Sequence, residues 1–224
     1  MEKLVIIGAK VDGAARGFLD IVRSMGSYDV VGFLDDAVVD SVGWIPVWGP
    51  LSMLPLLCQK GVRYIALAIG SHPELRCQVI TNAISYGLVP INAIHKGAYL
   101  ASGIQIGLGG RFAVGSIVNP ACQLGDGVII DTHASVDHNC TLADGVHIAP
   151  HACLCGRVSV GKYSMVGAGA VVLPDIHIGD KVTVGAGSVV IHDVPDGVTV
   201  MGVPAYEKNA NYKSAISRYY GTTG

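Results

Sequence analysis

Two histidines lie nine residues apart in SVDHNCTLADGVHIAP, at 135–150. His138 and His147 are the first candidates for chemistry, because a free imidazole accepts a proton near neutral pH. Such a base can take the proton of an attacking amine or hydroxyl, which contributes typically about 10² to 10⁴ in rate.

The elements that carry these histidines repeat with a period of six residues. Aliphatic or aromatic residues occupy every sixth position, at Leu100, Ile106, Phe112, Val118, Leu124, Ile130, Val136, Leu142, Ile148, Leu154, Val160, Val166, Val172, Ile178, Val184 and Val190. Neither a helix nor a plain strand has this period, but short strands that turn a corner every six residues do. Three such strands close a coil of 18 residues, and coils about 4.8 Å apart pair their backbones. We therefore predict a parallel β-helix, in which Cys122 stacks on Cys140 and His133 on His151.

The first 95 residues alternate strand and helix patterns. Strands are predicted at 3–9, 29–36, 62–70 and 88–94, and helices at 13–26, 51–61 and 72–87. This order predicts a small Rossmann-like parallel sheet of four strands, with ligands beyond the carboxyl ends of the strands. The candidate substrate-binding residues there are Gly8, Ala9, Asp35, Asp36, Ile69 and Gly70. The loop GAKVDG at 8–13 departs from GxGxxG, which disfavours a dinucleotide cofactor.

Charge, apolar content and cysteine spacing argue against a nucleic-acid-binding, membrane-spanning or secreted protein. The net charge is −2, with 15 basic and 17 acidic residues, so no basic surface for nucleic acid is expected. Half of the residues are hydrophobic, yet no apolar run has the length of a membrane span. The six cysteines form no CxxC pair, and the N-terminal apolar run is too short for a signal peptide. A reduced, cytoplasmic protein is expected.

Residues 1 to about 207 resemble the hexapeptide-repeat N-acetyltransferases that act on nucleotide-linked 4-amino-4,6-dideoxy sugars, and their sialic acid O-acetyltransferase relatives. The resemblance rests on the small α/β domain, INAIHKGAYLASG at 91–103, the hexads, VMGVPA at 200–205 and the two histidines. It implies a left-handed β-helix and homotrimers with active sites between neighbouring coils. It also implies acetyl-CoA as co-substrate and no metal. The implied domains are 1–95 for the nucleotide sugar and 96–207 for acyl transfer, followed by a tail at 208–224.

The same resemblance assigns residues to roles. His138 corresponds to the catalytic base, and His147 to a second active-site histidine that can bond the acetyl oxygen or the sugar. Asn139 replaces an acidic neighbour that orients the base, so Asp137, a backbone carbonyl or a carboxylate of another subunit remains as a possible substitute. The cofactor-binding positions are Gly156 at the thioester, Ala168 and Ala186 along the pantetheine arm, and Gly202 and Pro204 at the adenine. FLDD at 33–36 and AIG at 68–70 match the family's nucleotide contacts, whereas Ala14 stands where the family has a histidine.

Three alternatives stay open on sequence grounds. An O-acetyltransferase would use the same base, and a β-helix with a lost site would be a non-catalytic binding protein. His133 and His138 have the five-residue spacing of zinc ligands in the β-helical carbonic anhydrases, but the third position falls on Gly97, so no metal is expected. The favoured prediction is N-acetylation of a nucleotide-linked amino sugar in the pathway to a bacterial surface glycan.

Overall fold

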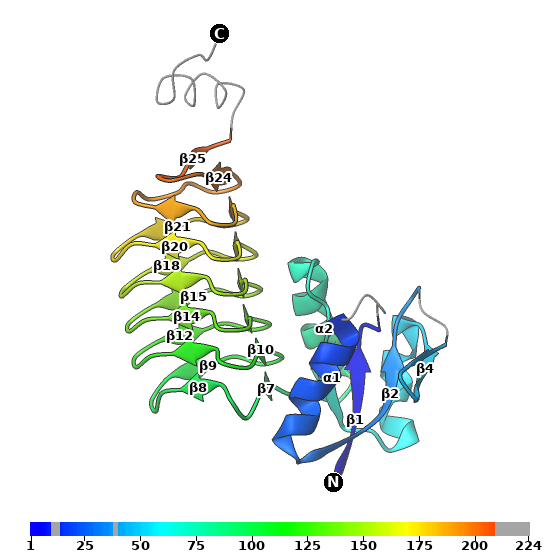
Figure 1. Cartoon of the computed structure of the whole chain (residues 1–224). Coiled ribbons are helices and arrows are strands. Elements are labelled where there is room, and N and C mark those ends of the chain that lie inside the picture. Colours follow the sequence, from blue (N-terminus) through cyan, green and yellow to red (C-terminus); the bar gives the residue numbers. More distant parts are fainter. Residues whose placement is uncertain (10–13, 38–39, 209–224) are drawn as a thin grey trace.

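The chain folds into an α/β domain and a column of stacked coils that lie side by side (Figure 1). The structure is a computed structural model that describes residues 1–9, 14–37 and 40–208. Of the predicted tail at 208–224, residues 209–224 therefore lie outside the described residues. In this described part, no helix has the length and apolar character needed to cross a membrane.

The N-terminal sheet has the strand order β3-β4-β2-β1-β5-β6. Its strands are β1 (Glu2–Ile7), β2 (Tyr28–Leu34), β3 (Ser41–Val42), β4 (Ile45–Gly49), β5 (Tyr64–Leu67) and β6 (Val89–Pro90). All neighbours are parallel except β3 and β4. Helices α1 (Ala14–Met25) and α2 (Pro73–Ser85) follow β1 and β5, and apolar side chains of the sheet are buried on both of its faces. The predicted Rossmann-like winding is confirmed, with the β3-β4 hairpin as an addition.

The segment 51–61 is not the helix that its apolar pattern predicted. It forms two short 3₁₀ helices, η1 (Leu51–Leu56) and η2 (Cys58–Lys60). Pro55 lies inside the first and has no N–H to donate, and Gly61 ends the second with a φ of 73°. A continuous α-helix is therefore excluded at this place.

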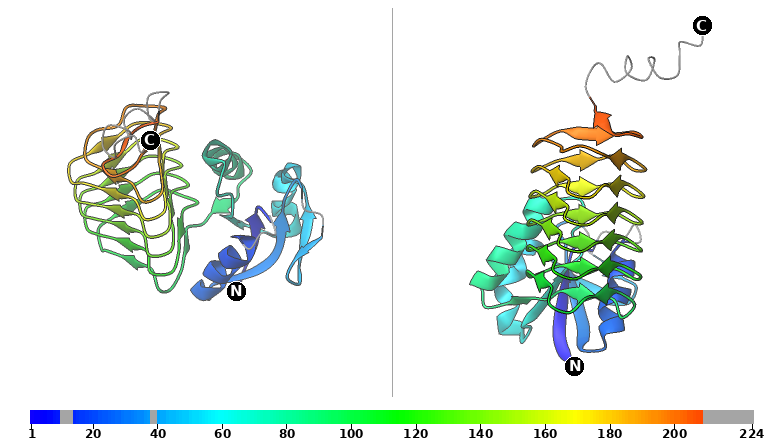
Figure 2. Two further views of the ribbon diagram at one scale, coloured as in Figure 1. Left: turned by 45° about the horizontal axis from the view of Figure 1, so that its top comes forward. Right: turned by 90° about the vertical axis from the view of Figure 1, so that its left-hand side faces the viewer.

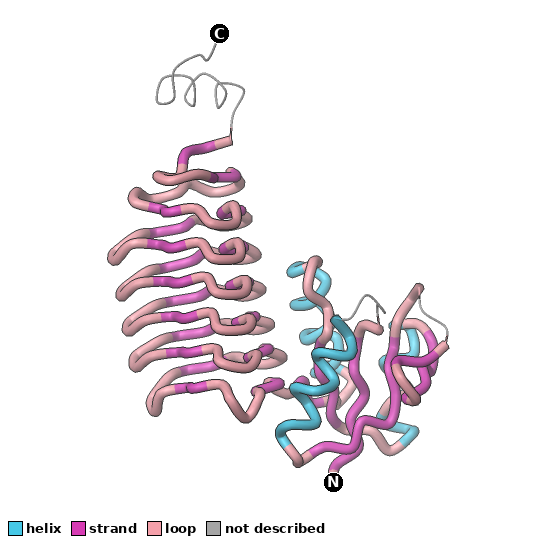
Figure 3. Tube along the Cα trace, in the orientation of Figure 1, coloured by secondary structure: helices cyan, strands magenta, loops and turns pink. Residues whose placement is uncertain are grey.

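The C-terminal part is a parallel β-helix (Figure 3), and its strands pair with residues 18 positions further along the chain. Ile130 pairs with Ile148 and Val136 with Leu154, and the predicted hexad residues form one continuous core. The stacking predictions are confirmed: the rings of His133 and His151 are parallel within 18° with centroids 5.4 Å apart, and Cys122 and Cys140 are both buried. The first coil begins at β7 (Ala93–Ile94), which the sequence had assigned to the preceding sheet.

The coils present three faces of different character. The docked face, toward the N-terminal domain, holds β7, β10 (Arg111–Phe112), β13 (Ile129–Ile130), β16 (His147–Ile148), β19 (Met165–Val166), β22 (Thr183–Val184) and β24 (Thr199–Met201), with β25 (Tyr206–Glu207) antiparallel at its end. The second, which we call the apolar face, holds β8 (Tyr99–Leu100), β11 (Ile117–Val118), β14 (Ser135–Val136), β17 (Cys153–Leu154), β20 (Val171–Val172) and β23 (Val189–Val190). The third, the polar face, holds β9 (Gln105–Ile106), β12 (Gln123–Leu124), β15 (Thr141–Leu142), β18 (Ser159–Val160) and β21 (His177–Ile178).

The outward side chains give the two open faces their names. In each two-residue strand the second residue points into the core, so the first points outward. The outward residues are Tyr99, Ile117, Ser135, Cys153, Val171 and Val189 on the apolar face, and Gln105, Gln123, Thr141, Ser159 and His177 on the polar face. Tyr99 is 58% exposed and Ile117 is 39% exposed. A contiguous strip of this kind is typical of an interface with another chain.

Arg76 of α2 joins the two domains. The N-terminal domain lies beside the first coils of the β-helix (Figure 2). The Arg76 side chain is fully buried. Nε donates to the carbonyl of Gly127 at 2.7 Å and Nη2 to that of Gly145 at 2.8 Å, both on the coils. Nη1 donates to the carbonyls of Ile69 and Gly70 at 2.9 and 3.0 Å. One guanidinium thus fixes the loop after β5 against two successive coils, and desolvation lowers its pKa to about 10.

Candidate active site

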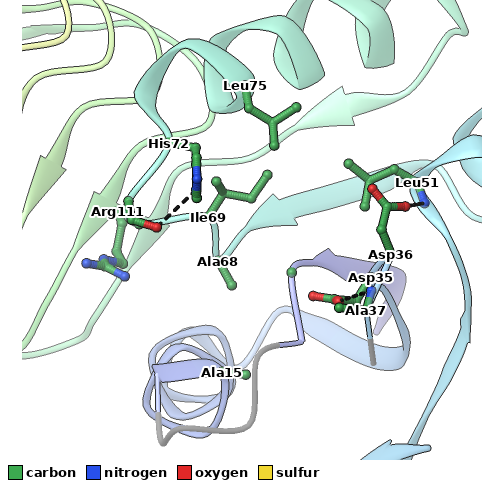
Figure 4. Close-up of a pocket in the computed structure, with 13 residues that line it drawn as sticks. Ala15, Asp35, Asp36, Ala37, Leu51, Ala68, Ile69, His72, Leu75 and Arg111 are labelled. Carbon is green, nitrogen blue, oxygen red and sulfur yellow. Dashed lines mark hydrogen bonds between the residues drawn. The ribbon is translucent and has the colours of Figure 1, made fainter. Parts of the chain in front are cut away.

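A cavity of about 500 Å³ opens at the carboxyl ends of β1, β2 and β5 (Figure 4). Five of the six predicted substrate-binding residues line it: Gly8, Asp35, Asp36, Ile69 and Gly70. The sixth, Ala9, is buried, and its N–H donates to Asp35 Oδ2 at 2.7 Å. The sequence therefore located this cavity, since the carboxyl ends of neighbouring parallel strands meet at one edge of a sheet.

The two aspartates that follow β2 fix the loops around this cavity. Asp35 Oδ1 accepts from the N–H of Ala37 at 2.8 Å. Asp36 Oδ1 accepts from the N–H of Leu51 at 2.8 Å, which ties the start of η1 to the cavity rim. A carboxylate oxygen can accept more than one hydrogen bond, so both groups are suited to accept from ribose hydroxyls or a base as well.

Arg111 is a site residue that sequence reasoning did not single out. It extends from β10 on the docked face and lines both the first cavity and a second one, of about 400 Å³, between α1 and the coils. Its Nη2 donates to Asp131 Oδ1 at 2.7 Å. Its Nε is buried and has no hydrogen-bond partner among the described residues. A guanidinium with an unused donor therefore stands between the two cavities.

His147 is paired with the same carboxylate, Asp131, which also lines the second cavity. His147 Nε2 lies 2.6 Å from Asp131 Oδ2, and the two side chains are 20% and 16% exposed. Burial acts to raise the pKa of Asp131, but the hydrogen bonds and charges of His147 and Arg111 outweigh it and hold that pKa below its usual value. The result is a chain of contacts, Arg111 to Asp131 to His147, along the docked face.

His138 lies elsewhere, at the corner between the apolar and polar faces, and is exposed. Its Nδ1 is 2.9 Å from Asn139 Oδ1. An amide oxygen only accepts, so Nδ1 carries the hydrogen and Nε2 keeps its lone pair. Asn139 has a φ of 61°, a conformation that asparagine tolerates better than most residues. Asp137, considered as a substitute partner, accepts instead from the backbone N–H of His138 at 2.8 Å.

Gly156 stands one coil beyond His138, as the 18-residue rule predicts. A Cβ at Gly156 would come within 2.7 Å of Cε1 and Nε2 of the His138 ring. The imidazole thus lies directly against the glycine backbone, and the Gly156 N–H makes no hydrogen bond within the described chain. A free amide beside a base can stabilise an oxyanion.

The other predicted cofactor residues lie at a different corner, between the docked and apolar faces. Ala168 and Ala186 are exposed there on successive coils, linked by the bond from Gly187 N–H to the Ala168 carbonyl. Gly202 is joined to this stack through its N–H, which donates to Ser188 Oγ at 3.1 Å, and Pro204 follows across a cis peptide bond. Asp131 begins the same corner a few coils earlier.

One chain therefore does not bring its predicted site residues together. His138, Asn139 and Gly156 occupy one edge of the apolar face, whereas His147, Ala168, Ala186, Gly202 and Pro204 lie on or near the opposite edge. The stacking rule could have placed Arg111 and His147 two coils apart on one face, with Asp131 at the adjoining corner. Among the residues described, no group of three or more His, Cys, Asp or Glu side chains is placed to hold a metal ion.

Comparison with known proteins gives consistent matches. The family described as "PglD N-terminal domain" matches residues 3–83, and "Bacterial transferase hexapeptide (six repeats)" matches 157–192. A mutant perosamine N-acetyltransferase from Caulobacter crescentus, solved with CoA and GDP-perosamine, is 35% identical with a TM-score of 0.88, over 93% of this chain and 98% of that one. The acetyltransferase domain of PglB from Neisseria gonorrhoeae, with acetyl coenzyme A, is 35% identical at 0.86, over 92% and 98%. WeeI from Acinetobacter baumannii shares the fold, with 22% identity and a TM-score of 0.81 over 92% and 100%. No match was found among the curated proteins.

Proposed function

Because the chain belongs to the nucleotide-sugar N-acetyltransferase family, we propose that it transfers the acetyl group of acetyl-CoA to the amine of a nucleotide-linked 4-amino-4,6-dideoxy sugar. The reaction would take place in the cytoplasm and supply a bacterial surface glycan. The observation that carries the proposal is the pair of cavities that share Arg111, one of them lined by Asp131, the partner of His147.

The two cavities fit the two ends of such a substrate. The nucleoside would lie in the larger cavity, against Asp35, Asp36 and the loop at Ile69. The sugar would lie in the second cavity, beside Asp131. The diphosphate that joins them would pass Arg111, which lines both cavities and whose guanidinium can donate to a phosphate oxygen. An anionic Asp131 beside the sugar favours a cationic amine over a neutral hydroxyl, which supports N- over O-acetylation.

The chemistry needs a base and an oxyanion donor. His138 Nε2 would accept the proton of the attacking nitrogen as the C–N bond forms and then pass it to the sulfur as the C–S bond breaks. The Gly156 N–H would bond the carbonyl oxygen while it carries negative charge. The pantetheine arm would follow Ala168 and Ala186, where larger side chains would obstruct it, toward Gly202 and Pro204.

These groups meet only if the protein is an oligomer, and we propose a homotrimer. The two sets of site residues lie at opposite edges of the apolar face. Three copies with this face turned to a common axis would bury Tyr99 and Ile117. They would also set His138 of one copy beside the His147 corner of the next. Closed cyclic symmetry of this kind repeats one composite site three times.

Purified protein should transfer acetyl groups from acetyl-CoA to GDP-perosamine or to a UDP-linked or dTDP-linked 4-amino sugar, with release of CoA and formation of an amide seen by mass spectrometry. The His138→Ala variant should bind acetyl-CoA in calorimetry but lose transfer by about 10² or more. Transfer to a hydroxylated sugar alone would make the protein an O-acetyltransferase. Absence of both transfer and acetyl-CoA binding would leave a non-catalytic β-helix. Light scattering after gel filtration tests the trimer.

A further inference from the structure

Acetylation of an amino sugar requires two protons to leave the same nitrogen. Near neutral pH the amine is an ammonium ion, with a pKa of about 8 if it behaves as an α-amino group does. One proton must leave before the nitrogen has a lone pair for attack. The second leaves after the C–N bond has formed and can pass to the departing thiolate. The proposed base, His138, handles the second proton, which leaves the first without an acceptor.

We infer that the Asp131–His147 pair accepts the first proton, which makes His147 a second catalytic base. The inference rests on the proposed function. His147 Nε2 lies 2.6 Å from a carboxylate oxygen, so Nε2 carries the hydrogen and Nδ1 keeps the lone pair. Nδ1 makes no hydrogen bond with any described residue. This is the arrangement in which a carboxylate orients a histidine base and stabilises the imidazolium that forms.

The surroundings of the two histidines favour this division of roles. Asn139 is neutral, so it sets the tautomer of His138 but adds no charge to stabilise an imidazolium. Asp131 is anionic, lines the sugar cavity and would attract the ammonium group itself. His147 belongs to the copy that would hold the sugar, whereas His138 and the Gly156 N–H would come from the next copy.

Charged and titratable groups face the Asp131–His147 pair from several neighbouring elements. Arg111 on β10 pairs with Asp131 at 2.7 Å, and Arg76 on α2 acts on Asp131 at longer range. Asp20 of α1 and His95 after β7 line the same cavity. Arg111 keeps Asp131 ionised without supplying a proton acceptor of its own, and His95 has its Nδ1 engaged as acceptor of the Gly97 N–H at 2.9 Å. His147 is therefore the base with a free lone pair beside the carboxylate.

The step balances without any further reactant. An N–H bond of the ammonium group breaks and its proton joins His147 Nδ1, which leaves a neutral amine. The amine attacks the thioester carbonyl, the C–S bond breaks, and the second proton reaches the sulfur through His138. The proton on His147 returns to solvent when the amide product leaves.

The test compares pH profiles of kcat/KM for the amino sugar, from about pH 6.5 to about pH 9.5, where the free amine becomes the main species. In His147→Gln and Asp131→Asn, we expect a loss of about 30-fold at pH 6.5, which is the ratio of ammonium to free amine for a pKa of about 8. The loss should shrink to less than about threefold at pH 9.5, where the amine no longer needs a base. The loss in His138→Gln should persist across the whole range. The KM for acetyl-CoA should change less than about twofold.

His177→Gln on the polar face, where the exposed ring is hydrogen-bonded to Ser159, is the matched control and should follow the wild-type profile. A loss in His147→Gln that stays constant with pH would overturn the inference and leave His147 with an orienting role. If Asp131→Asn fails to fold, His147→Gln carries the test alone. Wild-type protein without acetyl transfer would instead refute the proposed function.

Discussion

Mixing two inactive variants provides the most direct test of the composite site. His138→Ala removes the base from one edge of the apolar face, and His147→Ala removes the second histidine from the other. At pH 6, the His138→Ala homotrimer should retain less than about one hundredth of wild-type activity, since loss of a base typically costs about 10² or more. The His147→Ala homotrimer should retain about one hundredth, since only about 1% of an amine with a pKa of about 8 is free at that pH. A mixed trimer, however, contains one junction at which an intact His138 faces an intact His147.

The size of the recovery depends on the three-fold arrangement. In a random equal mixture, about three quarters of the trimers contain both variants, and about one in three of their junctions is intact. Coexpression of differently tagged copies should therefore restore about one quarter of wild-type kcat, measured as CoA release, with an unchanged KM for both substrates. Pairing His138→Ala with His138→Asn is the control and should restore nothing. Activity that stays at the level of the parents, in material shown to contain mixed trimers, would refute a site shared between copies.

Four single substitutions probe other parts of the reasoning. Asn139→Asp should move the acid limb of the pH–rate profile upward by about one pH unit, because a carboxylate beside the ring stabilises the imidazolium; an unmoved limb would contradict the role of Asn139. Gly156→Ala should cost about 10² in kcat with little change in Tm, since the new Cβ displaces only the His138 ring. Arg76→Lys should lower Tm by about 5 to 10 °C by leaving buried carbonyls unpaired, whereas Arg63→Lys at an exposed position should not. Asp131 has a lowered pKa, so its contribution to stability is present at neutral pH and is lost as the pH falls through that pKa; the difference in unfolding free energy between wild type and Asp131→Asn should therefore shrink in acid denaturation as the pH falls below the ordinary carboxyl pKa of 3.8.

The β-helix could be predicted in detail because each anchor, such as Leu142 or Val160, must fill the same narrow core once in every six residues. The same rule gave the His133–His151 stack and the contact between His138 and Gly156. The position of the cavity at the sheet edge could be predicted from strand direction alone. The β3-β4 hairpin escaped prediction because β3 is two residues long, which is too short for an alternating pattern.

The charged contacts could not be predicted in the same way. Arg111 and Asp131 are 20 residues apart, and their pairing depends on which way a corner side chain turns. Arg76 looks like an ordinary polar residue of an exposed helix, and only the docking of the two domains buries it. The nine-residue spacing already placed His138 and His147 half a coil apart. That the two histidines lie toward opposite edges of an apolar face became clear only from the structure.

Because successive coils pair in register, the β-helix can change its length only in whole coils. The rungs up to β22 use 18 residues each, and the last, from Thr183 to Thr199, uses 16. Excising 18 consecutive residues between Gly156 and Val184 would therefore shorten the column by one step of about 4.8 Å. Each remaining strand would meet a neighbour of the same kind, and the interior would stay filled. Chains of this architecture can thus lengthen or shorten the distance from thioester to adenine by duplication or deletion of whole rungs, without redesign of either end.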